Sequence, residues 1–152
     1  MLVQHCTLDE HRLIVQVSIT KPVLHEDIFK MSFNQQSYRA LVDTGAQRSV
    51  VSRRIITQQK LSRIGHMQFS SLHGPKTHGR YLASIGIWST NRIDPEGEEI
   101  TEQSLFSIEQ PFEVVDMEEN INFDMILGFD VLKNLSFNFD HKQAKFSLKL
   151  ST

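Results

Sequence analysis

The sequence predicts an all-β fold with one or two short helices, arranged as a small barrel or sandwich. Two observations carry this prediction. Short segments of alternating apolar and polar residues recur along the chain, and turn-forming residues separate them roughly every 8–12 residues. The 152 residues suffice for one domain and are too few for two full ones. We expect residues 1–11 to form an N-terminal tail and residues 12–150 to form the single domain.

The first predicted strand covers residues 13–19, in which every odd position is apolar. Pro22 ends it, because proline has no N–H to donate to a sheet. Residues 23–37 are ambiguous, although 28–33 are compatible with a second strand. The next predicted strand, 38–42, is almost entirely apolar and leads directly into a turn.

A short strand and a helix are expected next, followed by a long hairpin. The strand covers residues 49–51, and Ser52 can cap a helix that continues to about residue 60, because a serine hydroxyl satisfies a free N–H at a helix start. Residues 67–88 form the predicted hairpin, with a mobile tip over the turn-rich residues 73–79.

The C-terminal half begins with a polar stretch, residues 89–104, that we predict to be an exposed loop. A helix of one turn is expected over residues 130–134. The remaining apolar segments predict strands over residues 106–108, 112–115, 124–128, 135–139 and 146–150. The last two alternate most clearly and are expected to close the domain as a hairpin.

The stretch Leu41-Val42-Asp43-Thr44-Gly45-Ala46 is the most informative part of the sequence. Alone, Asp-Thr-Gly is compatible with an ordinary turn, since Asp and Gly are common turn residues. Three features favour a functional interpretation. The Asp directly follows a buried strand, and a glycine-bearing hairpin comes about thirty residues later. The apolar strand end Ile126-Leu127-Gly128 then precedes a short helix.

This order of features resembles the retropepsin-like aspartic protease family over most of the chain, roughly residues 12–150. The resemblance rests on the Asp-Thr-Gly-Ala stretch, the hairpin tip from Leu72 to Gly79, the segment 123–132 and the closing Phe-rich hairpin. The polar loop and the closing hairpin make the chain more similar to cellular and bacterial members than to short viral proteases. The resemblance implies an acid-protease barrel with one lobe per chain.

The resemblance also implies roles for individual residues. Asp43 is the expected catalytic carboxylate, and the Thr44 hydroxyl is expected to lock two active-site loops across a dimer. Gly45 would let backbone N–H groups approach the carboxylate. Ala46 stands where some relatives have a hydrogen-bonding Ser, and Gly128 would back the loop. The expected substrate-binding residues are Ala46, His73, Gly74, Pro75 and Gly79, the last four in a flap that holds one Pro and two His where viral flaps are Gly-rich.

The chemistry of this family needs two facing carboxylates that share one proton and activate a water. The chain has a single Asp-Thr-Gly, so we expect Asp43 of a second copy to complete the dyad in a homodimer. The predicted function is an aspartic endopeptidase acting on extended peptide segments. The alternative is a dimeric peptide-binding or scaffolding module with the same fold and little turnover. A domain cut from a larger precursor also stays open.

Composition argues against other functions. The 16 Lys and Arg residues against 18 Asp and Glu residues provide no basic excess for nucleic-acid binding. No apolar run is long enough to cross a membrane, and residues 1–10 contain no signal-peptide core, so we expect a cytoplasmic location. The seven His residues and single Cys show no metal-ligand spacing, and we expect no metal and no cofactor.

Overall fold

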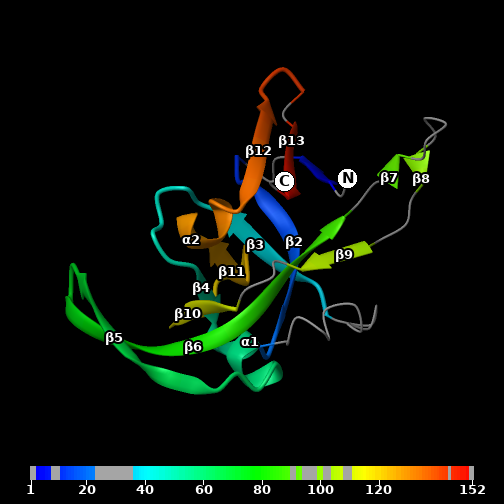
Figure 1. Cartoon of the computed structure of the whole chain (residues 1–152). Helices are drawn as coiled ribbons and strands as arrows, with labels where there is room; N and C mark the ends of the chain where they lie inside the picture. The colour runs from blue at the N-terminus through cyan, green and yellow to red at the C-terminus, as the bar shows by residue number, and fades with distance from the viewer. Residues whose placement is uncertain are drawn as a thin grey trace.

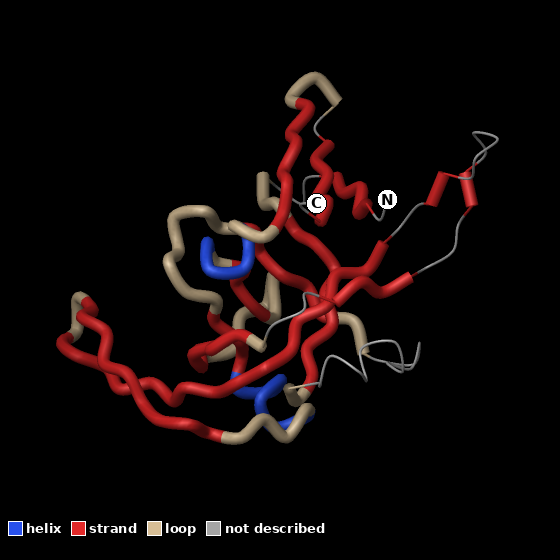
Figure 2. The backbone as a smooth tube through the Cα atoms, in the orientation of Figure 1, coloured by secondary structure: helices blue, strands red, loops and turns tan. Residues whose placement is uncertain are grey.

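The computed structural model describes residues 3–7, 11–22, 36–89, 92–93, 99–100, 104–107, 111–143 and 145–150. Strands dominate these residues and two short helices accompany them, which confirms the predicted all-β class (Figure 2). In this part of the chain, no helix combines the length and the apolar character needed to cross a membrane. The strand considered for 28–33 lies outside the described residues.

The main sheet is a closed path of strands rather than an open layer (Figure 1). Its order is β10-β4-β11-β3-β2-β6-β5, and β10 also pairs with β6, so the path returns on itself as a barrel. Strand β9 pairs with the end of β6. The strands are β2 (Ile14–Thr20), β3 (Tyr38–Val42), β4 (Val50–Ser52), β5 (Arg63–Ser71), β6 (Gly74–Ser89), β9 (Ser104–Ser107), β10 (Phe112–Met117) and β11 (Met125–Leu127).

Every central strand of the barrel contributes side chains to one apolar core. Val15, Val17 and Ile19 from β2 are buried, as are Ile85 and Ile87 from β6. Alternating side chains of a strand point to opposite faces, so the odd positions of both strands reach the interior. Burial of these side chains, each contributing roughly 1.5–3 kcal/mol, holds the strand ends that carry the site in place.

A second, three-stranded sheet stands beside the barrel, in the order β1-β13-β12. It consists of β1 (Val3–Thr7), β12 (Leu135–Asp140) and β13 (Lys145–Leu150). Its closing hairpin was predicted, but β1 lies within the residues predicted to form a tail. Val3 pairs with Lys149 and Thr7 with Lys145, so this part of the N-terminus is a strand. The pairing partner lies more than a hundred residues away in the sequence, and local pattern could not indicate it.

The polar stretch predicted as a loop contains β7 (Arg92–Ile93) and β8 (Glu99–Ile100), which pair with each other. Its other residues up to 103 lie outside the described part, except Ser89, which ends β6. The region is therefore not simply a loop, because its described strands β7 and β8 pair antiparallel.

Both predicted helices exist, with shifted ends. Helix α1 covers Arg53–Gln58 and α2 covers Phe129–Leu132. Ser52 occupies the N-cap position of α1, but its hydroxyl makes no hydrogen bond to the described residues, so the expected capping interaction is wrong. The Glu119 carboxylate instead accepts a hydrogen bond from the Arg54 N–H at 2.8 Å. A carboxylate at this position supplies the acceptor that a free N–H at a helix start needs.

Candidate active site

Asp43 follows the last residue of β3 and is held there by a neighbouring strand. Strand β11 runs parallel to β3, with Leu127 beside Val42, and the Asp43 N–H donates to the Leu127 carbonyl at 3.0 Å. On the other side, the Val42 N–H donates to the Leu13 carbonyl at 2.8 Å. Because backbone bonds fix both sides, the position of Asp43 is set by the barrel itself.

The loop after Asp43 turns its backbone toward the carboxylate. The Gly45 N–H donates to Asp43 Oδ1 at 2.9 Å, and the Ala46 N–H donates to the Asp43 carbonyl at 3.2 Å. A Cβ at Gly45 would lie 3.3 Å from Asp43 Oδ1, so a side chain there would crowd the carboxylate. Asp43 is half-buried, whereas Thr44 and Gly45 are exposed. One carboxylate oxygen is thus oriented by the chain, in a site open to solvent.

A hydrogen-bond network under the loop joins it to the start of α2. The buried Ser49 hydroxyl donates to Asp130 Oδ1 at 2.8 Å and accepts from the Gly128 N–H at 2.9 Å. Asp130 Oδ2 also accepts from the Ser49 N–H at 3.1 Å. These bonds satisfy polar groups that are otherwise removed from water, which is costly when they are left unpaired.

Gly128 lies against the back of the loop, as expected. The next N–H, of Phe129, donates to the Ala46 carbonyl at 2.7 Å. A Cβ at Gly128 would meet the Arg48 carbonyl carbon at 2.6 Å and the Ala46 carbonyl oxygen at 2.9 Å. Because both neighbours are backbone atoms, only glycine fits this contact without moving the loop.

The predicted flap is the β5–β6 hairpin, which extends away from the barrel with its tip on the same side as the loop between β3 and β4 (Figure 1). Its turn is tighter than predicted. Ser71 pairs with Gly74, so only Leu72 and His73 form the tip, and residues 74–79 belong to β6. Gly74 has φ +99°, a left-handed conformation that glycine adopts at no steric cost.

The structure places the predicted substrate-binding residues at two levels of the flap. His73, Gly74 and Pro75 lie at or next to the tip, where His73 and Pro75 are exposed. Pro75 is tolerated because, among the described strands, β6 pairs here with β5 alone. Gly79 is buried at the base of the flap, where a Cβ would lie 2.7 Å from the Tyr81 hydroxyl. Gly79 is therefore a packing residue of the flap base, separated from the tip by most of the hairpin.

Three charged residues connect the site loop to the barrel. The Glu113 carboxylate on β10 accepts from Arg80 on β6 and from Arg48 Nη1, the latter at 3.0 Å. These guanidinium groups, first Arg80 and then Arg48, hold the pKa of Glu113 below its usual value through hydrogen bonds. Arg48 belongs to the loop between β3 and β4, so Glu113 links that loop to the strand that carries the flap.

Sequence reasoning missed two members of the site, Ser49 and Asp130. Ser49 was assigned to the edge of a strand and Asp130 to the start of a helix. A polar residue directly before the apolar pair Val50-Val51 was the one available signal for Ser49. Their interaction spans 81 positions in the sequence, and only the pairing of β11 with β3 and β4 brings them together.

The closed barrel, the Asp43 loop backed by Gly128 and the projecting hairpin together define a retropepsin-like fold. The aspartyl protease family model matches residues 29–131, which is more than half of the chain. The chain therefore belongs to the aspartyl protease family, and the resemblance seen in its sequence is confirmed.

Solved structures of retropepsin-like proteins are similar to this chain at low sequence identity. A retropepsin-like aspartic protease from Rickettsia conorii is 13% identical with a TM-score of 0.53, covering 97% of this chain and 92% of that one. The simian foamy virus (mac) protease is 13% identical with a TM-score of 0.46, covering 80% and 92%. The retroviral protease-like domain of Ddi1 from Leishmania major is 20% identical with a TM-score of 0.45, covering 93% and 94%. Among curated proteins, no sequence matches this chain.

Proposed function

We propose that the protein is a homodimeric aspartic endopeptidase in which Asp43 and Asp43 of a second copy form the catalytic dyad. The observation that carries the proposal is the local geometry of Asp43. Its N–H donates to Leu127 of β11, the preceding residue Val42 donates to Leu13, and its Oδ1 accepts from the Gly45 N–H at 2.9 Å. A carboxylate held by the chain and open to solvent is suited to hold and activate a water.

The need for a second copy follows from the residue count. Of all the Asp residues in the sequence, Asp43 alone is followed two positions later by Gly. One chain thus offers one such loop, and two carboxylates are needed so that one accepts a proton while the other donates. In a twofold-symmetric dimer, the Asp43 loops of the two copies would face each other across the axis, because an isologous interface uses the same surface of both copies.

The dyad would hydrolyse a peptide bond by general acid–base catalysis. The ionised carboxylate takes a proton from the bound water, and the water oxygen attacks the carbonyl carbon of the substrate. The protonated carboxylate gives its proton to the carbonyl oxygen, which forms a neutral tetrahedral intermediate. The carboxyl group that received the water proton then gives it to the nitrogen, and the other carboxylate takes a proton from a hydroxyl of the intermediate. The C–N bond breaks, which releases a carboxylic acid and an amine. The two carboxylates exchange roles and titrate as one unit.

An extended peptide suits the surfaces around this site. The β5–β6 hairpin offers β5 as the edge of the main sheet, and an extended segment can pair with strands of a flap through its backbone. Leu72 at the tip is fully exposed, so an apolar side chain is available to cover substrate when the flap closes. His73, Gly74 and Pro75 lie beside it and would contact the same substrate.

Apolar surface is available for the second copy. Phe129, whose N–H binds the Asp43 loop, is 55% exposed. Strand β12 is an outer strand of the three-stranded sheet and exposes Phe137 and Phe139. Exposed aromatic residues and open strand edges are typical of surfaces that bind another chain. Thr44 is exposed in the single chain, which leaves its hydroxyl accessible to the second loop.

The substitution Asp43→Asn tests the proposal. It removes the carboxylate and keeps the shape, so cleavage of a peptide library should fall by about a thousandfold or more while the dimer persists in sedimentation. Adding excess variant to wild type should also lower wild-type activity, because mixed dimers hold a single carboxylate. Wild-type cleavage by the variant would overturn the mechanism. Peptide binding without products over a range of pH would support the scaffolding alternative.

A further inference from the structure

At the base of the flap, strands β6 and β10 stop pairing and separate, which we call the fork. Strand β10 pairs with β6 from Phe112 opposite Ala83 to Val115 opposite Arg80. From Val115 onward β10 pairs with β4 instead. Beyond Arg80, toward the tip, β6 pairs only with β5 among the described strands. The flap therefore leaves the barrel between Arg80 and Gly79.

Asp116 fills this fork with its carboxylate. It follows Val115 and would be opposite Gly79 if the ladder continued. Its Oδ2 accepts from the buried Gly79 N–H at 3.2 Å, which replaces the backbone bond that the ladder no longer supplies. Among the described residues, Asp116 is the only charged one that is buried, with 9% of its surface exposed. The carboxylate thus belongs to the barrel and binds the first residue of the flap.

His78, the next residue toward the tip, makes the second contact. Its Nδ1 lies 2.9 Å from the Asp116 carbonyl oxygen and 3.0 Å from Asp116 Oδ1. Both neighbours accept hydrogen bonds, so Nδ1 carries the hydrogen and donates. The imidazole also meets the Phe69 ring of β5 edge-on, with 5.4 Å between ring centroids. His78 therefore connects both strands of the flap to the end of β10.

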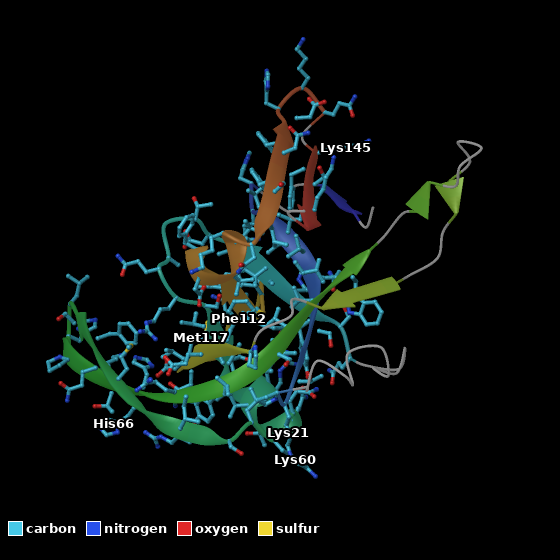
Figure 3. All side chains as sticks on the ribbon, viewed as in Figure 1. Lys21, Lys60, His66, Phe112, Met117 and Lys145 are labelled. Atoms are coloured by element: carbon cyan, nitrogen blue, oxygen red, sulfur yellow. The ribbon has the colours of Figure 1, made fainter. Side chains whose placement is uncertain are left out.

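His78 also borders a cavity, although only 21% of its side-chain surface is exposed. This cavity of about 400 Å³ lies between the flap base, the start of α1 and the end of β10; Figure 3 shows Met117 there, at the end of β10. The cavity is lined by Arg53, Lys76, Thr77, His78, Met117 and Glu118. A side chain that borders a cavity is not held by packing alone. The position of His78 thus depends on its hydrogen bonds to Asp116 as well as on its contact with Phe69.

We propose that His78 and Asp116 act as positioning residues that anchor the flap at its hinge and set how the flap closes on substrate. The inference rests on the proposed protease function. Asp116 fixes the hinge by binding Gly79, and His78 limits the angle of the hairpin. Loss of the His78 bond lets the flap occupy more open positions, so closure costs more free energy on substrate binding. Neither residue touches the reacting atoms.

Two substitutions of His78 separate the hydrogen bond from the ring. In His78→Phe the ring and its contact with Phe69 remain but the donor is lost. In His78→Asn the amide nitrogen takes the place of Nδ1 and can donate. We expect His78→Phe to raise KM for a peptide substrate about tenfold with kcat within about twofold, and His78→Asn to restore most of the loss. His66→Phe is the matched control, since exposed His66 pairs with Gly79 across the same hinge.

Hydrogen exchange of the unliganded protein tests the anchor without activity. In His78→Phe, amides of residues 66–79 should exchange faster than in wild type, whereas those of 80–83 should be unchanged. The proposal is overturned if His78→Phe matches His66→Phe in both exchange and KM, or if the faster exchange spreads evenly through the barrel. A protein that cleaves no peptide but shows the local exchange change would refute the protease function and keep the anchor.

Discussion

Ser49 shows how one buried hydroxyl holds the loop that follows Asp43. The residue is fully buried, donates to Asp130 and accepts from the Gly128 N–H. Ser49→Ala would leave the Gly128 N–H and one Asp130 oxygen without this partner. We expect a loss of about 1–3 kcal/mol in the free energy of unfolding, measured by urea denaturation. Cleavage should fall as well, because Gly128 supports the loop that carries Asp43.

Ser62→Ala provides the control for this substitution. Ser62 is exposed, and the same chemical change there should alter stability by no more than about 0.5 kcal/mol. Equal stability of the Ser49 and Ser62 variants would mean that the network under the loop contributes nothing.

At the residue scale, the sequence predicts what local chemistry encodes. Asp43, Gly45 and Gly128 could be identified because the motifs that carry the family resemblance, Asp-Thr-Gly and Ile-Leu-Gly, are short and continuous in the sequence. Ser49 and Asp130 could not, since each fits an ordinary strand or helix start and their hydrogen bond depends on the fold. The Ser52 cap failed for a related reason: Glu119, distant in the sequence, supplies the acceptor at that helix start.

At the element scale, Glu113 joins β10 to β6 and to the loop before β4. Its pKa is lowered by Arg80 and then Arg48, so its ionised form favours the folded state. The resulting stabilisation is complete above the unfolded-state pKa and is lost as pH falls through the lower folded-state value. We expect Glu113→Gln to unfold at lower urea than wild type at pH 7. The difference should shrink as pH falls below 4.5, the ordinary value.

Glu118→Gln tests whether this effect is specific, because Glu118 is exposed and lies one residue beyond the same strand. Its urea midpoint should follow that of wild type at every pH. A Glu113→Gln difference that stays constant down to pH 3 would contradict the assignment to the carboxylate.

Elements were predictable where their pattern was local. The hairpin of the flap was expected from its alternating residues, but its tip was placed too widely, because Pro75 and Gly79 resemble turn residues while they pair in β6. Strand β5 is mostly exposed and carries many polar residues, so its sequence gave no indication of how far its pairing with β6 continues. Strand β1 was missed since its only described partner, β13, is at the opposite end of the chain.

At the scale of the whole molecule, the proposed dyad predicts that activity depends on protein concentration, because one chain would supply only half of it. Strand β12 is an outer strand and exposes Phe137 and Phe139, so we expect it to contribute to the contact between copies. Phe139→Lys places a charge on that surface. The dissociation constant of the dimer, measured by sedimentation, should rise at least about tenfold.

The same variant should regain activity when its concentration is raised, since the substitution leaves Asp43 in place and would weaken only the assembly of the proposed dyad. Ile64→Lys is the control, because Ile64 is similarly exposed on β5, far along the chain from β12. An unchanged urea midpoint for Phe139→Lys would separate weaker assembly from unfolding. If the variant dimerises and cleaves as wild type does at every concentration, the second copy binds through a surface other than β12. The surface to test next would then be that of exposed Phe129, beside the Asp43 loop.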